Sequence, residues 1–169
     1  MGGAALNGVR IDREIIPILA DNFVSTCLRA NDIPYYICGS YRRGKKDCGD
    51  IEIVFHANEG DRRNLLQAKI MQIFGMTLDN KPKMQGLYGQ VQFDLFIADD
   101  SSLGAMLMHA TGSGDFNVKM RTAAMKRGWL LNQYGLFKRV DRTPVVLGKD
   151  EATIFCHLGM EYIKPEDRI

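Results

Sequence analysis

One short stretch of the sequence, CGSYRRGKKDCGDIEIVF at residues 38–55, limits the fold more than any other. It begins with a Gly39-Ser40 turn, continues through basic residues and ends in an alternating run in which Asp50 and Glu52 lie two residues apart. Successive side chains of a strand point to opposite faces, so both carboxylates should project from one face. Paired carboxylates repel each other, and a divalent cation such as Mg²⁺ resolves the repulsion. The stretch therefore predicts a cation site beside a turn able to approach phosphate oxygens.

A third acid completes this arrangement if it lies on a neighbouring strand. Residues 87–97 alternate, with Val91, Phe93 and Leu95 on one face and Gln92, Asp94 and Phe96 on the other. Three converging carboxylates could hold two ions about 4 Å apart, as phosphoryl-transfer enzymes do. The alternative is that Asp50 and Glu52 form only the exposed side of an edge strand. The adjoining Gly-Ser turn and the arginines and lysines after it favour the cation site.

The remaining pattern divides into a strand-rich part and a helix-and-hairpin part. Apolar spacing predicts helices at 10–30, 61–74 (with Asp61 as its cap), 101–111, 115–127 and 150–158. It predicts strands at 35–38, 51–55 and 87–97, and a hairpin at 129–140 that turns at Gly135. We expect an α+β fold: a mixed sheet with flanking helices in residues 1–100, and a small helix-and-hairpin subdomain in residues 101–169.

Charge is distributed unevenly along the 169 residues, although the net charge is only +2. Between Lys119 and Arg142 there are seven basic residues and one acid, so that segment is +6 and the rest sums to −4. A basic stretch beside an acidic remainder suggests a polyanion-binding face next to a cation-binding one. A solvated charged face explains the basic stretch equally well.

Other features bear on the environment of the chain. No run of 18 or more apolar residues is present, and the first residues lack a secretory pattern, so we expect a protein with no membrane contact and a cytoplasmic or other intracellular location. A viral protein acting in a host cell fits that expectation too. The four cysteines show no C-x-x-C spacing, which makes reduced thiols the default. A Walker loop is excluded, because Asp50-Ile51 follows the second glycine of the stretch Gly44 to Gly49.

Taken together, three blocks of the sequence resemble the family X DNA polymerases, which include polymerase beta and very small viral repair polymerases. The blocks are GSYRRGKKDCGDIEIV, VQFDLFIA and HATGSGDFNVKMRTAAMKRGWLLNQYGLF. They are similar to the palm block, to the strand that bears the third catalytic Asp, and to the thumb block of that family. The resemblance runs from about Tyr36 to Arg168 and implies a nucleotidyltransferase palm followed by a thumb.

The resemblance also implies roles for individual residues. Asp50, Glu52 and Asp94 would hold two Mg²⁺ ions, with Mn²⁺ as a substitute; one ion activates the primer 3′-hydroxyl and the other neutralises the leaving pyrophosphate. The nucleotide-binding residues would be Gly39, Ser40, Arg43, Gly49, His109, Thr111, Gly112 and Asn117. The DNA-binding residues would be Lys119, Arg121, Lys126, Arg127, Asn132, Tyr134 and Lys138.

Several residues depart from the family pattern. Glu52 stands where most members carry Asp, and its longer arm should still bind Mg²⁺. Gln92 replaces an Arg beside the third acid, which should slow the chemistry, and Val118 replaces a polar residue on the template side. Cys48 replaces a small polar residue next to the triphosphate. Because Cys38 flanks the same loop, a regulatory disulfide is an alternative to two free thiols.

One departure concerns substrate choice. His109-Ala110 stands where the family often has two aromatic residues that exclude a ribose 2′-hydroxyl. We therefore hypothesise that discrimination against ribonucleotides is weakened.

The resemblance implies a monomeric DNA-directed DNA polymerase that adds dNTPs to primer-template or gapped DNA in repair, without proofreading. Only 38 residues precede Gly39, so we expect no lyase activity, and DNA held through phosphates should bind less tightly as salt rises. One alternative is a template-independent or RNA-directed nucleotidyltransferase, since the palm block alone is shared by such enzymes. A second is a non-catalytic nucleic-acid-binding relative, which the presence of all three acids disfavours.

Overall fold

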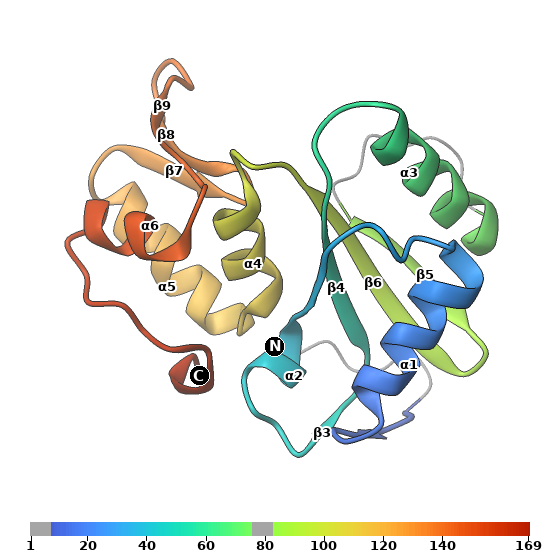
Figure 1. Ribbon diagram of the computed structural model, residues 1–169. Helices are drawn as coiled ribbons and strands as arrows, with labels where there is room; N and C mark the ends of the chain where they lie inside the picture. Colours follow the sequence, from blue (N-terminus) through green and yellow to red (C-terminus); the bar gives the residue numbers. More distant parts are fainter. Residues whose placement is uncertain (1–7, 76–82) are drawn as a thin grey trace.

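The first part of the chain is built around a mixed sheet of four strands (Figure 1). The computed structural model describes residues 8–75 and 83–169. The sheet order is β2-β4-β6-β5, where β4 and β6 are parallel and the two outer strands run antiparallel to their neighbours. The strands are β2 (Tyr35–Ile37), β4 (Ile51–His56), β5 (Lys83–Tyr88) and β6 (Val91–Ala98).

Helices cover both faces of this sheet, and the side-chain alternation decides which residues meet them. On one face lie α1 (Ile16–Asn22), the π-helical turns η1 (Phe23–Leu28) that continue it, and α3 (Asp61–Phe74) (Figure 1). The odd-numbered residues of β4 and β6, such as Ile53 and Leu95, are buried against them in the larger core. The even-numbered residues, among them Glu52 and Asp94, therefore point to the opposite face.

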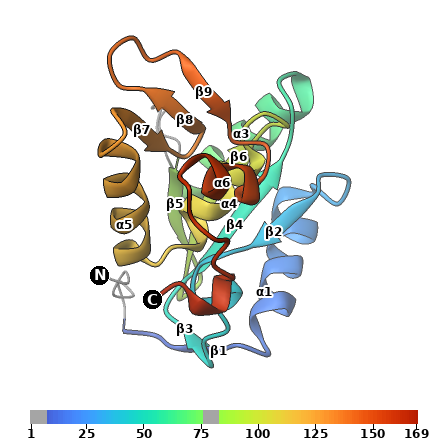
Figure 2. The same cartoon turned by 90° about the vertical axis from the view of Figure 1, so that its left-hand side faces the viewer.

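The loop between β2 and β4 folds into α2 (Gly39–Arg42) and β3 (Asp47–Cys48). The strand β3 pairs with β1 (Ile11–Asp12), which ties the start of the described chain to this loop (Figure 2). Gly39 has a φ of 57°, and a Cβ placed there would lie 1.2 Å from Oε2 of Glu52. Only glycine allows the loop to approach this carboxylate so closely.

The second part consists of helices packed on a three-stranded antiparallel sheet. It contains α4 (Leu103–Thr111), α5 (Gly114–Met125), β7 (Trp129–Asn132), β8 (Gly135–Lys138), β9 (Pro144–Leu147), α6 (Glu151–His157) and the 3₁₀ turn η2 (Pro165–Asp167). Its core includes Phe116 and Met120 of α5, Leu136 of β8 and Phe155 of α6. No helix within residues 8–75 and 83–169 is long and apolar enough to span a bilayer.

Helix α4 packs on two sides, against the second core and against the first sheet. Its residues Ala105 and Met108 pack in the second core, whereas Met106 and Ala110 pack against Phe96 of β6 in a third cluster that covers the even-numbered face of the first sheet. The division of the chain near Asp100, which precedes this helix, stays a prediction.

The expected α+β architecture, a mixed sheet with flanking helices and a helix-and-hairpin second part, is confirmed. Several details were wrong. The strand expected at 87–97 is two strands, because Leu87-Tyr88 end β5 and Gly89-Gln90 form the turn to β6. Asp61 is the first residue of α3 rather than its cap, which is Gly60. The hairpin turns at Gln133-Tyr134, before Gly135. Its third strand, β9, was missed.

Candidate active site

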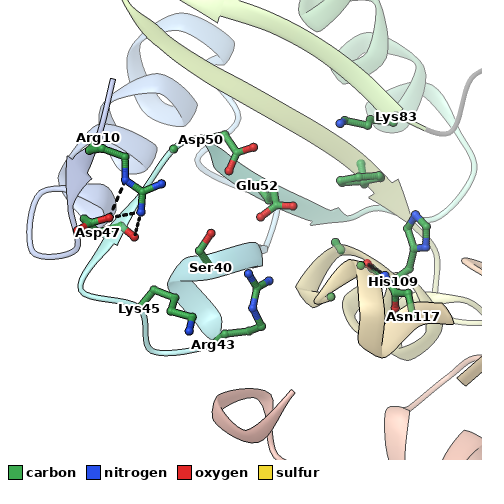
Figure 3. Close-up of a pocket in the computed structure, with 15 residues that line it drawn as sticks. Arg10, Ser40, Arg43, Lys45, Asp47, Asp50, Glu52, Lys83, His109 and Asn117 are labelled. Carbon is green, nitrogen blue, oxygen red and sulfur yellow. Dashed lines mark hydrogen bonds and ion pairs between the residues drawn. The ribbon is translucent and has the colours of Figure 1, made fainter. Parts of the chain in front are cut away.

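A pocket of about 520 Å³ opens where the two parts of the chain meet (Figure 3). Predicted site residues that line it are Ser40, Arg43, Gly49, Asp50, Glu52, His109, Gly112 and Asn117. Arg10, Lys45, Asp47, Lys83, Phe96, Ala110 and Gly114 line it as well. The pocket therefore joins the loop between β2 and β4 to the end of α4 and the beginning of α5.

The strand register brings the acids together. Asp50 immediately precedes β4, and Glu52 on β4 lies directly opposite Asp94 on the parallel strand β6. Figure 3 shows the Asp50 and Glu52 carboxylates on the pocket wall, across from Ser40 and Arg43. Glu52 and Asp94 thus share one face of the sheet as predicted, whereas Asp50 lies just before the strand and lines the same pocket as Glu52.

Electrostatics at these acids favour a bound cation. Burial raises the pKa of Glu52 to about 8, and the charges of Asp50 and then Asp94 add to the shift. Burial, followed by the charge of Asp94, also raises the pKa of Asp50. Asp50 and Glu52 are therefore each costly to ionise. Mg²⁺ and Mn²⁺ prefer hard oxygen ligands, and a bound cation relieves the repulsion between carboxylates. This donor set therefore fits a divalent cation.

The third acid is engaged by other side chains in this structure. Asp94 is 3% exposed; Lys83 lies with its Nζ 2.5 Å from Oδ2, and Gln92 donates from Nε2 to Oδ1 at 3.0 Å. Among residues 8–75 and 83–169, no group of three acids, histidines or cysteines is already arranged to ligate a metal. The register places Asp94 opposite Glu52, but Asp94 does not line the pocket and its carboxylate is paired with Lys83 and Gln92.

Two neighbouring arginines of the α2 loop point in different directions. Arg43 lines the pocket and donates to the backbone oxygen of Thr111. Arg42 donates to Oγ1 of Thr111 at 2.7 Å and to both carboxylate oxygens of Glu151 in α6, at 2.8 and 3.0 Å. Thr111 is fully buried and does not line the pocket. It positions the two arginines rather than facing a ligand.

Glu151 is the centre of a buried ionic cluster that sequence reasoning missed. Arg168 also donates to both of its oxygens, at 2.9 and 3.1 Å, and the Tyr162 hydroxyl donates to Oε2 at 2.9 Å. Burial would raise the pKa of Glu151, but the hydrogen bonds from Arg42 and Arg168 outweigh it and lower the pKa to about 2. The cluster fixes the α2 loop against α6 and the C-terminal segment.

The side of the pocket formed by α4 and α5 is also ordered by hydrogen bonds. Asn117 donates from Nδ2 to the backbone oxygen of His109 at 2.9 Å, and Nη2 of Arg121 lies 3.5 Å from Nδ1 of His109. Burial, then the nearby charges of Arg121 and Lys83, lower the pKa of His109. This imidazole is therefore neutral near pH 7 and offers a polar surface without charge.

The predicted DNA-binding residues along α5 and at its C-terminal end lie on different sides of the helix. At about 100° per residue, Lys119 and Lys126 lie roughly 200° and 180° around α5 from Asn117, whereas Arg121 lies about 40° from it. Arg127 follows the helix, and Tyr134 and Lys138 are exposed on the hairpin. The Oδ1 of Asn132 accepts the backbone N–H groups of Tyr134 and Gly135, so this oxygen is committed to the turn.

Besides Lys45 of the loop, two basic residues outside the predicted set, Arg10 and Lys83, lie on the pocket wall. Arg10 is ion-paired with Asp47 (Figure 3). Lys83 is ion-paired with Asp94. Arg10 reaches the pocket because β1 pairs with β3 across 37 residues of sequence, and Lys83 because β5 pairs with β6. No local motif marks either position.

The two cysteines of the loop are free and buried. Burial raises the pKa of Cys38 to about 12 and also raises that of Cys48. Because the thiolate is the reactive form, neither sulfur is prepared for oxidation in this fold. The disulfide between them, raised as an alternative, is not formed here.

Comparison with known proteins identifies the class of this chain. The DNA polymerase beta palm model matches residues 10–126, and the DNA polymerase beta thumb model matches residues 106–169. The chain belongs to the polymerase beta family, the family X of DNA-directed DNA polymerases.

Individual relatives agree with this assignment. Repair DNA polymerase X of African swine fever virus is 26% identical over 92% of this chain and 86% of its own length. DNA polymerase lambda of Rattus norvegicus is 27% identical over 78% of this chain, which matches 28% of that longer protein. The structure of Leishmania infantum polymerase beta in a ternary P/T complex superposes with a TM-score of 0.73 at 25% identity, covering 96% of this chain and 78% of the other.

Proposed function

We propose that this protein is a repair DNA polymerase that fills short gaps by adding dNTPs to a primer 3′-hydroxyl. The observation that carries the proposal is the pocket itself, where a Gly-Ser loop with Arg43 faces Asp50 and Glu52 in a chain of the polymerase beta family. The viral relative is named a repair polymerase, and the Leishmania structure is a primer-template complex. We further propose that the protein acts as a monomer inside the cell.

The loop supplies the nucleotide-binding groups. Ser40, Gly49 and Arg43 line the same pocket, and the guanidinium of Arg43 suits phosphate oxygens. On the opposite wall, His109, Gly112 and Asn117 would support the base and sugar of the incoming nucleotide. Tight positioning of this kind supplies much of the rate in phosphoryl transfer.

The acids supply the reactive end of the pocket. Asp50 and Glu52 would hold the triphosphate-side divalent ion, and all three acids, including Asp94, the primer-side one. When bound, such ions lower the pKa of the attacking hydroxyl and neutralise the leaving pyrophosphate. Asp94 would lie nearest the attacking oxygen.

The decisive experiment is primer extension on a one-nucleotide gapped duplex with Mg²⁺, with each dNTP supplied separately against each templating base. We expect incorporation to follow the template, and EDTA to abolish it. Incorporation independent of the template would favour a terminal transferase instead. Gel-shift binding of the duplex without extension under any metal would favour a non-catalytic relative.

A second prediction concerns the sugar. Ala110 lines the pocket beside His109 and is 4% exposed, so a single methyl group occupies this part of the wall. We expect the preference for dGTP over GTP opposite a templating C to be no more than about 100-fold, because a small apolar wall rejects an added hydroxyl weakly. The ratio of kcat/KM values measures it. A preference near 10⁴-fold would show that another group excludes the 2′-hydroxyl.

A further inference from the structure

The surroundings of Asp94 contain a contact that the proposed reaction does not explain. Each of its carboxylate oxygens is taken by a different partner: Lys83 lies 2.5 Å from Oδ2, and Gln92 donates to Oδ1 at 3.0 Å. The Asp94 side chain is 5% exposed, so these partners replace water around the charge. Each oxygen of this carboxylate therefore has a protein partner.

The strand register explains why Lys83 reaches this acid. On β5, Lys83 lies directly opposite Phe96 of β6, two residues beyond Asp94 on the same face of the sheet. Such diagonal neighbours are within reach of a long side chain. Lys83 is 41% exposed along its side chain, whereas Asp94 is nearly buried. The carboxylate is therefore fixed, and the ammonium has a route into water.

Gln92 shows that the arrangement around Asp94 is constrained. Its amide is turned so that Nε2 meets Asp94, and its Oε1 is then left buried without a hydrogen-bond partner among the described residues. A buried acceptor without a donor is unfavourable. The amide keeps this orientation because the opposite one would place two oxygens against each other. The hydrogen bond from Gln92 to Asp94 thus outweighs the cost of leaving Oε1 of Gln92 without a donor.

We propose that Lys83 is a tethered competitor for the divalent cation at Asp94. The Lys83 ammonium binds one oxygen of Asp94 and the Gln92 amide binds the other. A cation that binds Asp94 displaces the ammonium into solvent. The inference rests on the proposed function, because it takes Asp94 as a cation ligand. It predicts that Lys83 lowers the affinity of the site for a cation, and that it neutralises Asp94 when no metal is bound.

The test measures Mn²⁺ binding by electron paramagnetic resonance on the full chain, with no DNA or nucleotide present. We expect Lys83→Met to bind Mn²⁺ about tenfold more tightly than the unchanged protein, the effect of removing one competing contact. Lys45→Met is the matched control, because Lys45 lines the same pocket and has no carboxylate contact among the described residues. It removes the same charge and should change the affinity by no more than about threefold.

Two further measurements keep the outcome clear. In an Asp94→Asn background, Lys83→Met should change Mn²⁺ affinity no more than Lys45→Met does, because the carboxylate for which Lys83 and the cation compete is absent. In EDTA, Lys83→Met should melt at a lower temperature than the unchanged protein, and Mn²⁺ should raise its Tm by about 2–4 °C more. Lys83→Gln, which keeps a polar group, provides the same comparison if the methionine variant folds poorly.

Equal affinity in the unchanged protein and in Lys83→Met, with binding weakened by Asp94→Asn, would overturn the role of Lys83 and leave the proposed polymerase intact. Absence of Mn²⁺ binding in every variant and in the unchanged protein would overturn both.

Discussion

Asp94→Ala is expected to lower the rate of nucleotide addition by about 10³-fold or more while leaving gapped-DNA binding within about threefold. A metal that activates the attacking group contributes several kcal/mol, and each 1.36 kcal/mol is a factor of ten in rate. The measurement is single-turnover extension of a gapped duplex, with binding followed by fluorescence anisotropy. Asp94 is nearly buried and does not line the pocket, so few DNA contacts depend on it.

A matched control separates chemistry from folding. Asp100→Ala removes an exposed acid outside this pocket, whose carboxylate contacts His56 and Asn58 instead. It should leave extension unchanged within about twofold, since surface substitutions usually have small effects. Asp94→Asn, which retains the shape of the side chain, should be as inactive as Asp94→Ala. Extension that persists in both Asp94 variants would remove this acid from the mechanism.

Glu151→Ala is the second change with a large expected effect, and it acts from outside the pocket. It removes the carboxylate partner of Arg168, whose side chain is 0% exposed, and of Arg42 in the α2 loop. Loss of one member of a buried ion pair costs about 3–5 kcal/mol. We expect the free energy of unfolding in urea to fall by that amount, and KM for dNTP to rise because Arg43 follows Arg42.

The pH dependence of stability provides an independent readout of the same cluster. The pKa of Glu151 is about 2 in the folded protein against an ordinary value of 4.5. Below pH 4.5 the unfolded chain binds this proton more readily than the folded one, so the stabilisation is complete above that pH and is lost as the pH falls toward 2. Glu151→Gln should flatten the acid limb of the stability curve, and exposed Glu161→Ala should leave it unaltered. Identical acid limbs in all three proteins would contradict this role.

The acidic part of the site was predictable because its signals are local. Gly39, Ser40, Asp50 and Glu52 lie within 14 residues, and alternation along a strand is enough to set the face on which the acids lie. The partner acid, Asp94, was found by the same alternation on a second strand. Short-range periodicity was therefore enough to predict most of the palm.

The rest depended on pairings that no local pattern specifies. Lys83 meets Asp94 only through the β5–β6 register, and Arg42 meets Glu151 across 109 residues. The turn at Gly89, which has a φ of 62°, was passed over because the apolar alternation continues across it. Charge counting grouped Lys119 with Arg121, although helical geometry places them on different sides of α5.

Helix α4, shared between the palm sheet and the thumb core, limits how such a chain can be recombined. Met106 and Ala110 pack against the palm, whereas Ala105 and Met108 pack in the thumb core, on opposite sides of one nine-residue helix. A thumb transplanted from a relative with this helix would leave the palm sheet poorly covered, and one transplanted without it would lose part of its own core. An exchange between relatives should therefore move the two halves together, because α4 packs against both.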